Sequence, residues 1–176
     1  ELSLFQDSQP ATQPGPPPPS VDNPCQTEQK CCTGIVYAEA GGAKGCQKAL
    51  VCVMQTRMKL SKDPGWKNFS DNGGYCAIAE SGEVAGVGNK RYTNSYNDWL
   101  CTEPAEQKAN DNAADACKAG CDNDPTGGAQ YWFTTCKAAE VNLGSKQFTG
   151  RNPNCTKITI PGCSMCFVKC KTAPKK

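Results

Sequence analysis

Glu39 has the surroundings of a residue that could act as an acid. It follows the apolar run IVYA at positions 35–38 and precedes the pair Gly41-Gly42. A carboxylate in such a place either lies in solvent on the far face of its helix or stands at the edge of a pocket with a raised pKa. A glutamate of the second kind can protonate the leaving oxygen in glycoside cleavage. The residues alone leave both interpretations open.

Two helices separated by a glycine break should position Glu39. The first contains IVYA and should end at Gly41-Gly42, because glycine adopts the left-handed conformation that commonly follows a helix. The second is predicted from apolar residues at helical spacing, which are Cys46, Leu50, Val53, Met54 and Met58. Glu39 would then lie at the end of the first helix.

Further along the chain, the pattern is more irregular. We expect a short segment over 75–84 with a turn at Ser81-Gly82, and a third helix over 103–119 that ends at Gly120. Residues 145–176 are expected to form loops and a short strand. At 176 residues the chain suits one domain with one core. The predicted class is mainly α (α+β), with irregular loops and a small hairpin.

The cysteine content points to an oxidising compartment. Fourteen cysteines in a chain of this length predict a disulfide-rich extracellular protein, although spacing cannot give the connectivity. Cys163 and Cys166 have the spacing of a redox or zinc pair. No second motif of that kind accompanies them, so structural disulfides are favoured. We therefore expect most or all of the cysteines to be paired.

Processing signals are consistent with secretion. Numbering begins at Glu1 and not at methionine, as expected after removal of a signal peptide. Asn68 and Asn154 begin glycosylation sequons, which have a meaning only in a eukaryotic secretory pathway.

Composition excludes several classes of function. The chain has no histidine, which rules out Ser-His-Asp and Cys-His catalysis and removes the commonest ligand of a catalytic zinc. A formal charge of +2 is too small to indicate nucleic acid or an acidic membrane surface as partner. No apolar run approaches membrane-spanning length. We expect no metal and no cofactor.

The first 24 residues differ from the rest. They contain seven prolines and no cysteine, so this segment cannot bury enough apolar surface to fold and should be extended. One interpretation is a flexible linker. The other is a docking arm for self-association, because Leu2, Leu4 and Phe5 precede the proline run Pro16–Pro19.

Two motifs resemble the SleB/CwlJ-type cell-wall hydrolases, a family of lysozyme-like enzymes. The first, roughly Tyr-x-Glu-Ala-Arg-Gly, is matched by YAEAGG at 37–42. An Ala- and Val-rich helix that ends Asn-Arg-Val follows it in the family. Here that helix is matched by 49–58, with Arg57 in the arginine place and Thr56 where the family has asparagine. The second motif, Pro-Thr/Ser-Gly-Gly-Ala-x-Tyr-Phe, is matched by PTGGAQYWF at 125–133. Two motifs in the family's order are more specific than either alone.

The resemblance implies a fold and a set of site residues. It implies a lysozyme-like domain from 25 onward, with Glu39 as general acid. The family lines its groove with Gln-x-Gly-Gln/Ala-Phe-Ser/Thr, and this chain has Glu80, Gly82 and Glu83 in that place without the aromatic and the hydroxyl. These three residues and Tyr131 are therefore candidates for substrate binding, with Phe133 beneath Tyr131. Glu80 and Glu83 are equally well explained as exposed loop carboxylates.

The resemblance leaves two functions open. One is a secreted hydrolase or lytic transglycosylase that acts on peptidoglycan or on a related N-acetylated glycan. The other is a catalytically inactive glycan-binding or assembly protein on the same fold. Retention of Glu39 in an apolar setting favours the enzyme, whereas the altered groove residues and the proline-rich arm favour the inactive protein.

Overall fold

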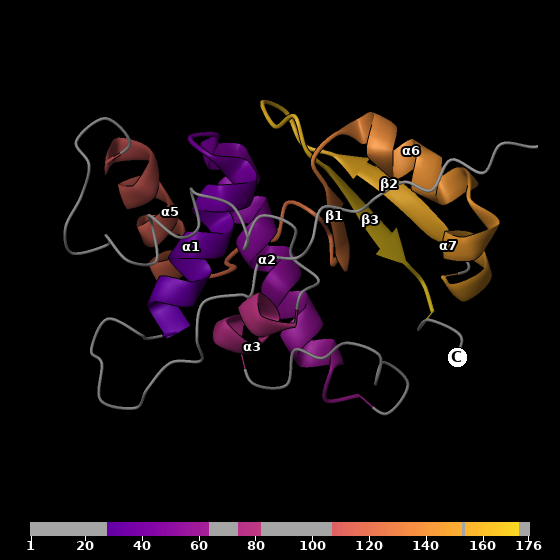
Figure 1. The fold of residues 1–176 in the computed structure, drawn as a ribbon, viewed down its shortest axis with the longest axis horizontal. Coiled ribbons are helices and arrows are strands. Elements are labelled where there is room, and N and C mark those ends of the chain that lie inside the picture. Colours follow the sequence, from indigo (N-terminus) through magenta and orange to yellow (C-terminus); the bar gives the residue numbers. More distant parts are fainter. Residues whose placement is uncertain (1–27, 64–73, 82–106, 153, 173–176) are drawn as a thin grey trace, which may run out of the picture.

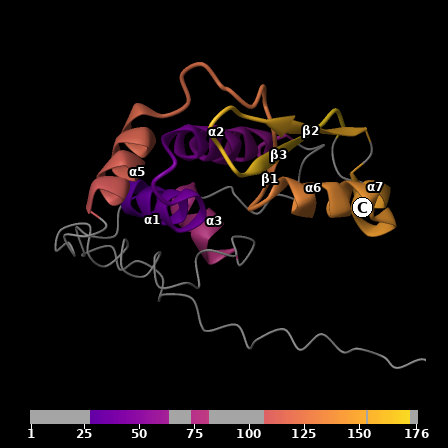
Figure 2. The same ribbon diagram turned by 90° about the horizontal axis from the view of Figure 1, so that it is seen from above.

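The computed structural model describes residues 28–63, 74–81, 107–152 and 154–172. Helices occupy one half of the molecule, and a sheet with two short helices occupies the other (Figures 1 and 2). The helical half contains α1 (Glu28–Ala40), α2 (Lys44–Leu60), α3 (Tyr75–Glu80) and α5 (Gln107–Ala119). The other half contains β1 (Tyr131–Phe133), α6 (Cys136–Gly144), α7 (Lys146–Arg151), β2 (Cys155–Thr159) and β3 (Cys166–Cys170). This arrangement confirms the mainly helical α+β class.

The glycine break between α1 and α2 lies where the sequence predicts it. Gly41 has φ 53°, and its N–H donates to the carbonyl oxygen of Tyr37 at 2.9 Å. A positive φ is strained for residues with a Cβ, so glycine ends α1 without that cost. The chain then turns into α2, and α1 packs against both α2 and α5. Glu39 is thereby held in the last turn of α1.

The first part of the short segment expected over 75–84 forms helix α3. The Glu28 carboxylate, from the start of α1, accepts hydrogen bonds from the backbone N–H groups of Tyr75 and Cys76. These are among the N–H groups that a helix start leaves without partners. Gly74 has φ 97°, and a Cβ there would lie 2.4 Å from a Glu28 carboxylate oxygen. The cap comes from a distant residue, which a local pattern does not indicate.

The sheet is antiparallel, with strand order β1-β3-β2. The hairpin of β2 and β3 confirms the small hairpin, and β1 adds a third strand on the far side of β3. Trp132 of β1 pairs with Phe167 of β3, which pairs with Ile158 of β2. Residues in register point to the same face of a sheet, so these three side chains share one face. That face lies against the helical half.

The buried side chains form two clusters, where the sequence suggested one core. Strand β3 explains the division, because alternate residues of a strand point to opposite faces. Phe167 belongs to the larger cluster with the side chains of α1 and α2, whereas Cys166 and Val168 belong to a smaller cluster with Ala139 of α6. Both faces of β3 are therefore buried.

Helices α6 and α7 occupy a region where the sequence indicated only loops and a strand. Each begins at a hydroxyl side chain that accepts a backbone hydrogen bond. Thr135 Oγ1 accepts from Ala138 N at 3.1 Å, and Ser145 Oγ accepts from Gln147 N at 3.2 Å. Such caps stabilise a helix start by about 1 kcal/mol. Both helices are too short to show a convincing apolar period.

Six disulfides connect the described elements. They are Cys31–Cys76, Cys32–Cys117, Cys46–Cys163, Cys52–Cys121, Cys136–Cys166 and Cys155–Cys170. Cys163 and Cys166 thus bond to different partners, which confirms structural disulfides over a redox or zinc pair. The remaining two cysteines, Cys25 and Cys101, lie outside the described residues.

Peptide mapping should recover these six pairs. The non-reduced protein, alkylated and digested, is expected to release the six disulfide-linked peptides, and intact mass should show at most two alkylated thiols. Mass spectrometry of the same digest after reduction serves as the control. Linked peptides with any other pairing among these twelve cysteines would contradict the connectivity.

Several expectations fall outside the described residues. They are the proline-rich arm over 1–24, the start of the third helix before 107, and the sequon at Asn68. These remain predictions. Within the described ranges, no helix is both long and apolar enough to cross a membrane.

Candidate functional site

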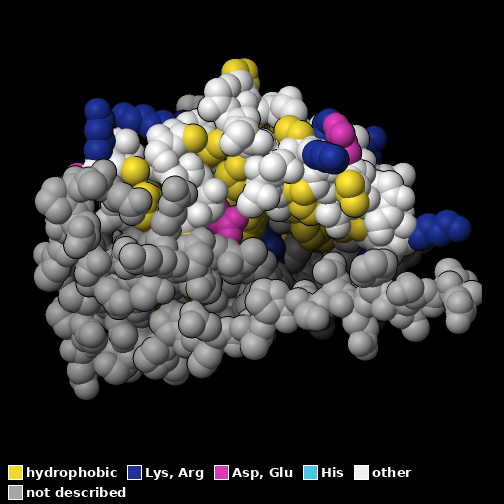
Figure 3. Space-filling model, turned by 45° about the horizontal axis from the view of Figure 1, so that its top comes forward, with side chains coloured by type: hydrophobic (Ala, Val, Ile, Leu, Met, Phe, Trp, Pro, Cys, Tyr) yellow, Lys and Arg dark blue, Asp and Glu magenta, His cyan; other side chains and the backbone are white. Residues whose placement is uncertain are grey.

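Glu39 contacts the aromatic run that lies far from it in the sequence. Its side chain is half-buried, and Oε2 accepts a hydrogen bond from Trp132 Nε1 at 3.3 Å. On the face drawn in Figure 3, few described acidic side chains are visible; one near the centre lies beside hydrophobic and uncharged side chains, and another lies beside basic ones. The indole N–H therefore helps to orient the Glu39 carboxylate.

Strand register explains why Trp132 is the residue that reaches Glu39. Trp132 is paired with Phe167, so its side chain points to the sheet face that packs on the helices. Helix α1 lies on that same side and presents Glu39 from its last turn. A shift of β1 by one residue would turn Trp132 away from the helices.

Arg57 of α2 completes this cluster. Its side chain is 4% exposed, and its Cζ lies 5.6 Å from the centroid of the Trp132 ring. A guanidinium over an aromatic face is attracted by the negative potential of the ring. The indole thus contacts a cation through its face and the Glu39 carboxylate through its N–H edge. We call Glu39, Arg57 and Trp132 the indole cluster.

The turn that leads into β1 is built around Asp124. Its carboxylate accepts from Thr126 N and Thr126 Oγ1, both at 2.7 Å, and from Gly128 N at 2.6 Å. Thr126 Oγ1 in turn accepts from Ala129 N at 3.2 Å, and Gly127 and Gly128 have φ 60° and 89°. Thr126 therefore closes a turn, and the two glycines supply the backbone geometry that it requires. This turn sets the direction in which β1 begins.

Substituting Asp124 by alanine should destabilise the protein by about 2–3 kcal/mol. The change leaves the N–H of Gly128 and two groups of buried Thr126 without their charged acceptor. Urea unfolding followed by circular dichroism measures the loss. Asp122→Ala is the matched control, because Asp122 is exposed and close by in the chain. Equal unfolding free energies of the two variants would contradict this role.

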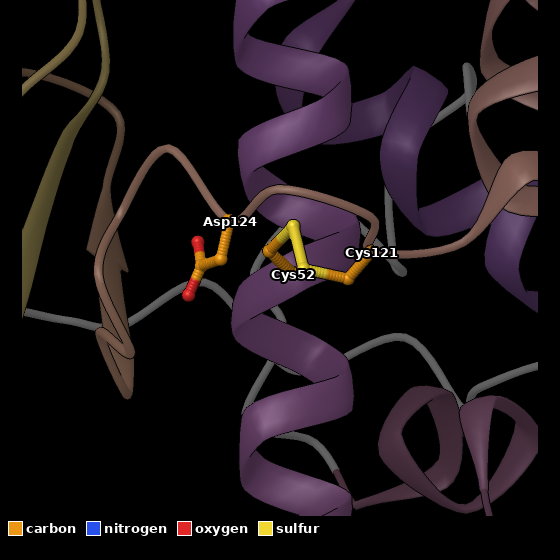
Figure 4. A group of neighbouring side chains, drawn as sticks. All are labelled: Cys52, Cys121 and Asp124. Carbon is orange, nitrogen blue, oxygen red and sulfur yellow. A yellow bond between two sulfur atoms is a disulfide. The ribbon is translucent and has the colours of Figure 1, made fainter.

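Asp124 also lies beside two cysteines, in a group that could suit a metal ion. Ligand atoms of Cys52, Cys121 and Asp124 lie within 4.8 Å of one another. Figure 4 shows the two sulfur atoms joined in a disulfide and the carboxylate beside them. Cysteine binds metals as the thiolate, which a disulfide does not offer. In the oxidised protein, this group lacks the donors of a metal site.

Tyr131 lies on the opposite face of β1 from Trp132. Its ring packs edge-to-face on Phe148 at 5.3 Å, and Phe133 contacts the same ring at 6.1 Å. Tyr131 and Phe133 therefore share a face and both pack on Phe148, whereas Trp132 contacts Glu39 from the other face. The role of Tyr131 in substrate binding stays a prediction. Trp132 was not named from the sequence, because three consecutive aromatic residues do not reveal which of them faces the helices.

The other predicted site residues are not placed beside Glu39 by the structure. Glu80 ends α3, and its side chain is outside the described part of the chain, as are Gly82 and Glu83 entirely. Their roles stay predictions. Comparison with models of protein families, with curated proteins and with solved structures finds no match to this chain.

Proposed function

We propose that this protein is a lysozyme-like, glycoside-cleaving enzyme of the extracellular space, with Glu39 as its general acid. The substrate is peptidoglycan or a related N-acetylated glycan, and the reaction is hydrolysis or lytic transglycosylation. The six disulfides support an oxidising compartment. The resemblance to the SleB/CwlJ-type hydrolases supplies the reaction class.

One observation carries the proposal. Glu39 lies in the first motif, Arg57 on the helix that follows it, and Trp132 in the second motif. In the indole cluster, Trp132 contacts both Glu39 and Arg57. Segments that match the two family motifs thus meet in one place through Glu39 and Trp132, although Tyr131, the aromatic residue that the resemblance named, lies on the other face of β1. A common role at one site explains this convergence better than separate structural roles.

The chemistry assigned to the cluster is proton delivery. Glu39 would protonate the glycosidic oxygen as positive charge develops on the sugar ring. Trp132 holds the carboxylate by its N–H, and Arg57 holds the indole through its face. The substrate's own acetamido or hydroxyl group would serve as the second reacting group, since no second carboxylate is assigned.

Product analysis tests the proposal. The purified protein is incubated with peptidoglycan, and the soluble products are examined by mass spectrometry. Anhydro ends would identify a transglycosylase, and reducing ends a hydrolase. Absence of both, with the protein retained on insoluble peptidoglycan, would favour the alternative of an inactive glycan-binding protein. Heat-denatured protein is the control for spontaneous release.

A further inference from the structure

A second site lies on the other face of β1, away from the indole cluster. A cleft of about 340 Å³ opens where α6 meets α7, and Tyr131 of β1 lines it. We call it the elbow cleft. Its volume lies in the lower part of the range of about 300–1,000 Å³ that is usual for small-molecule sites. The elbow cleft is therefore large enough for a sugar unit.

The floor of the elbow cleft is rigid. The rings of Tyr131 and Phe148 pack edge-to-face, and Tyr131 Oη donates to Asn152 Oδ1 at 2.6 Å. Asn152 is 7% exposed, and its Nδ2 donates to the Phe148 carbonyl oxygen at 3.1 Å. The Tyr131 ring is thus held by its hydrogen bond, and the Phe148 ring by packing on Tyr131, before any ligand arrives. Fixed aromatic surfaces lose little conformational entropy on binding.

The rim carries polar groups that the described part of the chain leaves without partners. Arg151 is exposed there and pairs with no described carboxylate, and the side-chain amide of Gln147 has no described partner. Asn142 uses Nδ2 on the Ala138 carbonyl at 2.9 Å, which leaves its Oδ1 available. Among the described residues, no acidic side chain lines the elbow cleft. One cation and two amide groups therefore face the ligand space.

These groups define the ligand chemically. A guanidinium binds a carboxylate with two parallel hydrogen bonds, amides bind hydroxyl or acetamido groups, and aromatic rings pack on the apolar face of a sugar. We propose that the elbow cleft binds a saccharide unit that carries a carboxylate, with Arg151 on the carboxylate and Gln147 and Asn142 on neighbouring polar groups. The unit that fits peptidoglycan is N-acetylmuramic acid, and this choice of sugar rests on the proposed function.

Two sugars that differ in one group test whether the ligand's carboxylate contributes to binding. N-acetylmuramic acid and N-acetylglucosamine differ by the lactyl ether that bears it. Both are titrated into the ¹⁵N-labelled full chain carrying Glu39→Gln, with backbone amide shifts as the readout. We expect saturable shifts over residues 145–152, and an affinity for N-acetylmuramic acid roughly tenfold higher than for N-acetylglucosamine.

Substitutions locate the contact. Arg151→Gln should reduce the affinity for N-acetylmuramic acid to that for N-acetylglucosamine. Arg151→Lys should give an intermediate affinity, because lysine keeps the charge but cannot form the two parallel hydrogen bonds of a guanidinium. Lys118→Gln is the matched control, since it removes an exposed cation on α5, at the opposite end of the molecule from α7 (Figures 1 and 2). Thermal unfolding of each variant checks its fold.

Three results would overturn the proposal. They are equal affinity for the two sugars, unchanged affinity in Arg151→Gln, or shifts confined to residues outside the elbow cleft. Its failure is separable from that of the proposed function. If the protein cleaves peptidoglycan but binds no sugar in the elbow cleft, only the proposed saccharide site is wrong. If the cleft binds the sugar but the protein cleaves nothing, only the proposed enzymatic activity is wrong.

Discussion

Replacing Glu39 by glutamine should lower the rate of glycan cleavage by about 10²–10⁴-fold, the usual contribution of a general acid. Glutamine has nearly the same shape and its oxygen can still accept from Trp132 Nε1, but it carries no proton that can be given to the leaving oxygen. The free energy of unfolding should change by less than about 1 kcal/mol, because the amide nearly matches the carboxylate in shape and can still accept from Trp132 Nε1. Product release from peptidoglycan and thermal unfolding measure the two effects separately.

Glu140→Gln is the matched control for this experiment. Glu140 is an exposed carboxylate on α6 that pairs with Lys157. The hydrogen bond and charge of Lys157 lower the pKa of the Glu140 carboxyl, so it is ionised and unsuited to proton donation near neutral pH. This variant should cleave at the wild-type rate. A Glu39→Gln protein that is equally active would remove Glu39 from the mechanism.

Complete reduction of the disulfides should unfold the described domain. Each bridge stabilises a protein by about 2–4 kcal/mol, and native domains are stable by only about 5–15 kcal/mol in total. Loss of all six bridges therefore exceeds the reserve of a domain with two small cores. Far- and near-ultraviolet circular dichroism of the reduced, alkylated protein measures the outcome. The same alkylation without reductant is the control.

Loss of one bridge should be far milder, even where its cysteines lie far apart in the sequence. Cys46–Cys163 spans 117 residues. Without this bridge, α2 and the β2–β3 hairpin remain covalently linked over a shorter stretch of chain, because Cys52–Cys121 joins α2 to the segment before β1 and Cys136–Cys166 joins α6 to β3. Substituting both Cys46 and Cys163 by alanine should therefore cost about 2–4 kcal/mol and leave the fold intact.

The prediction for complete reduction has its own contradicting outcome. A fully reduced chain that keeps a cooperative thermal transition would show that the two cores hold the fold without the disulfides.

The sequence by itself determined those parts of the molecule that depend on near neighbours. The apolar period of α2 and the stop of α1 at Gly41 are readable because helical periodicity and glycine caps are local features. The position of Glu39 in the last turn of α1 followed from them. The short helices α6 and α7 were not predicted, because the only local signals for them are the hydroxyl caps at Thr135 and Ser145.

The partners of these elements were decided only in the tertiary structure. Trp132 reaches Glu39 because β1 pairs with β3 in one register, and Tyr131 consequently lines the elbow cleft on the other face. The six disulfide pairs likewise join residues between 15 and 117 positions apart. The register of the strands and the pairing of the cysteines depend on how the two cores pack against the sheet. Those contacts join distant positions, so no local pattern carries them.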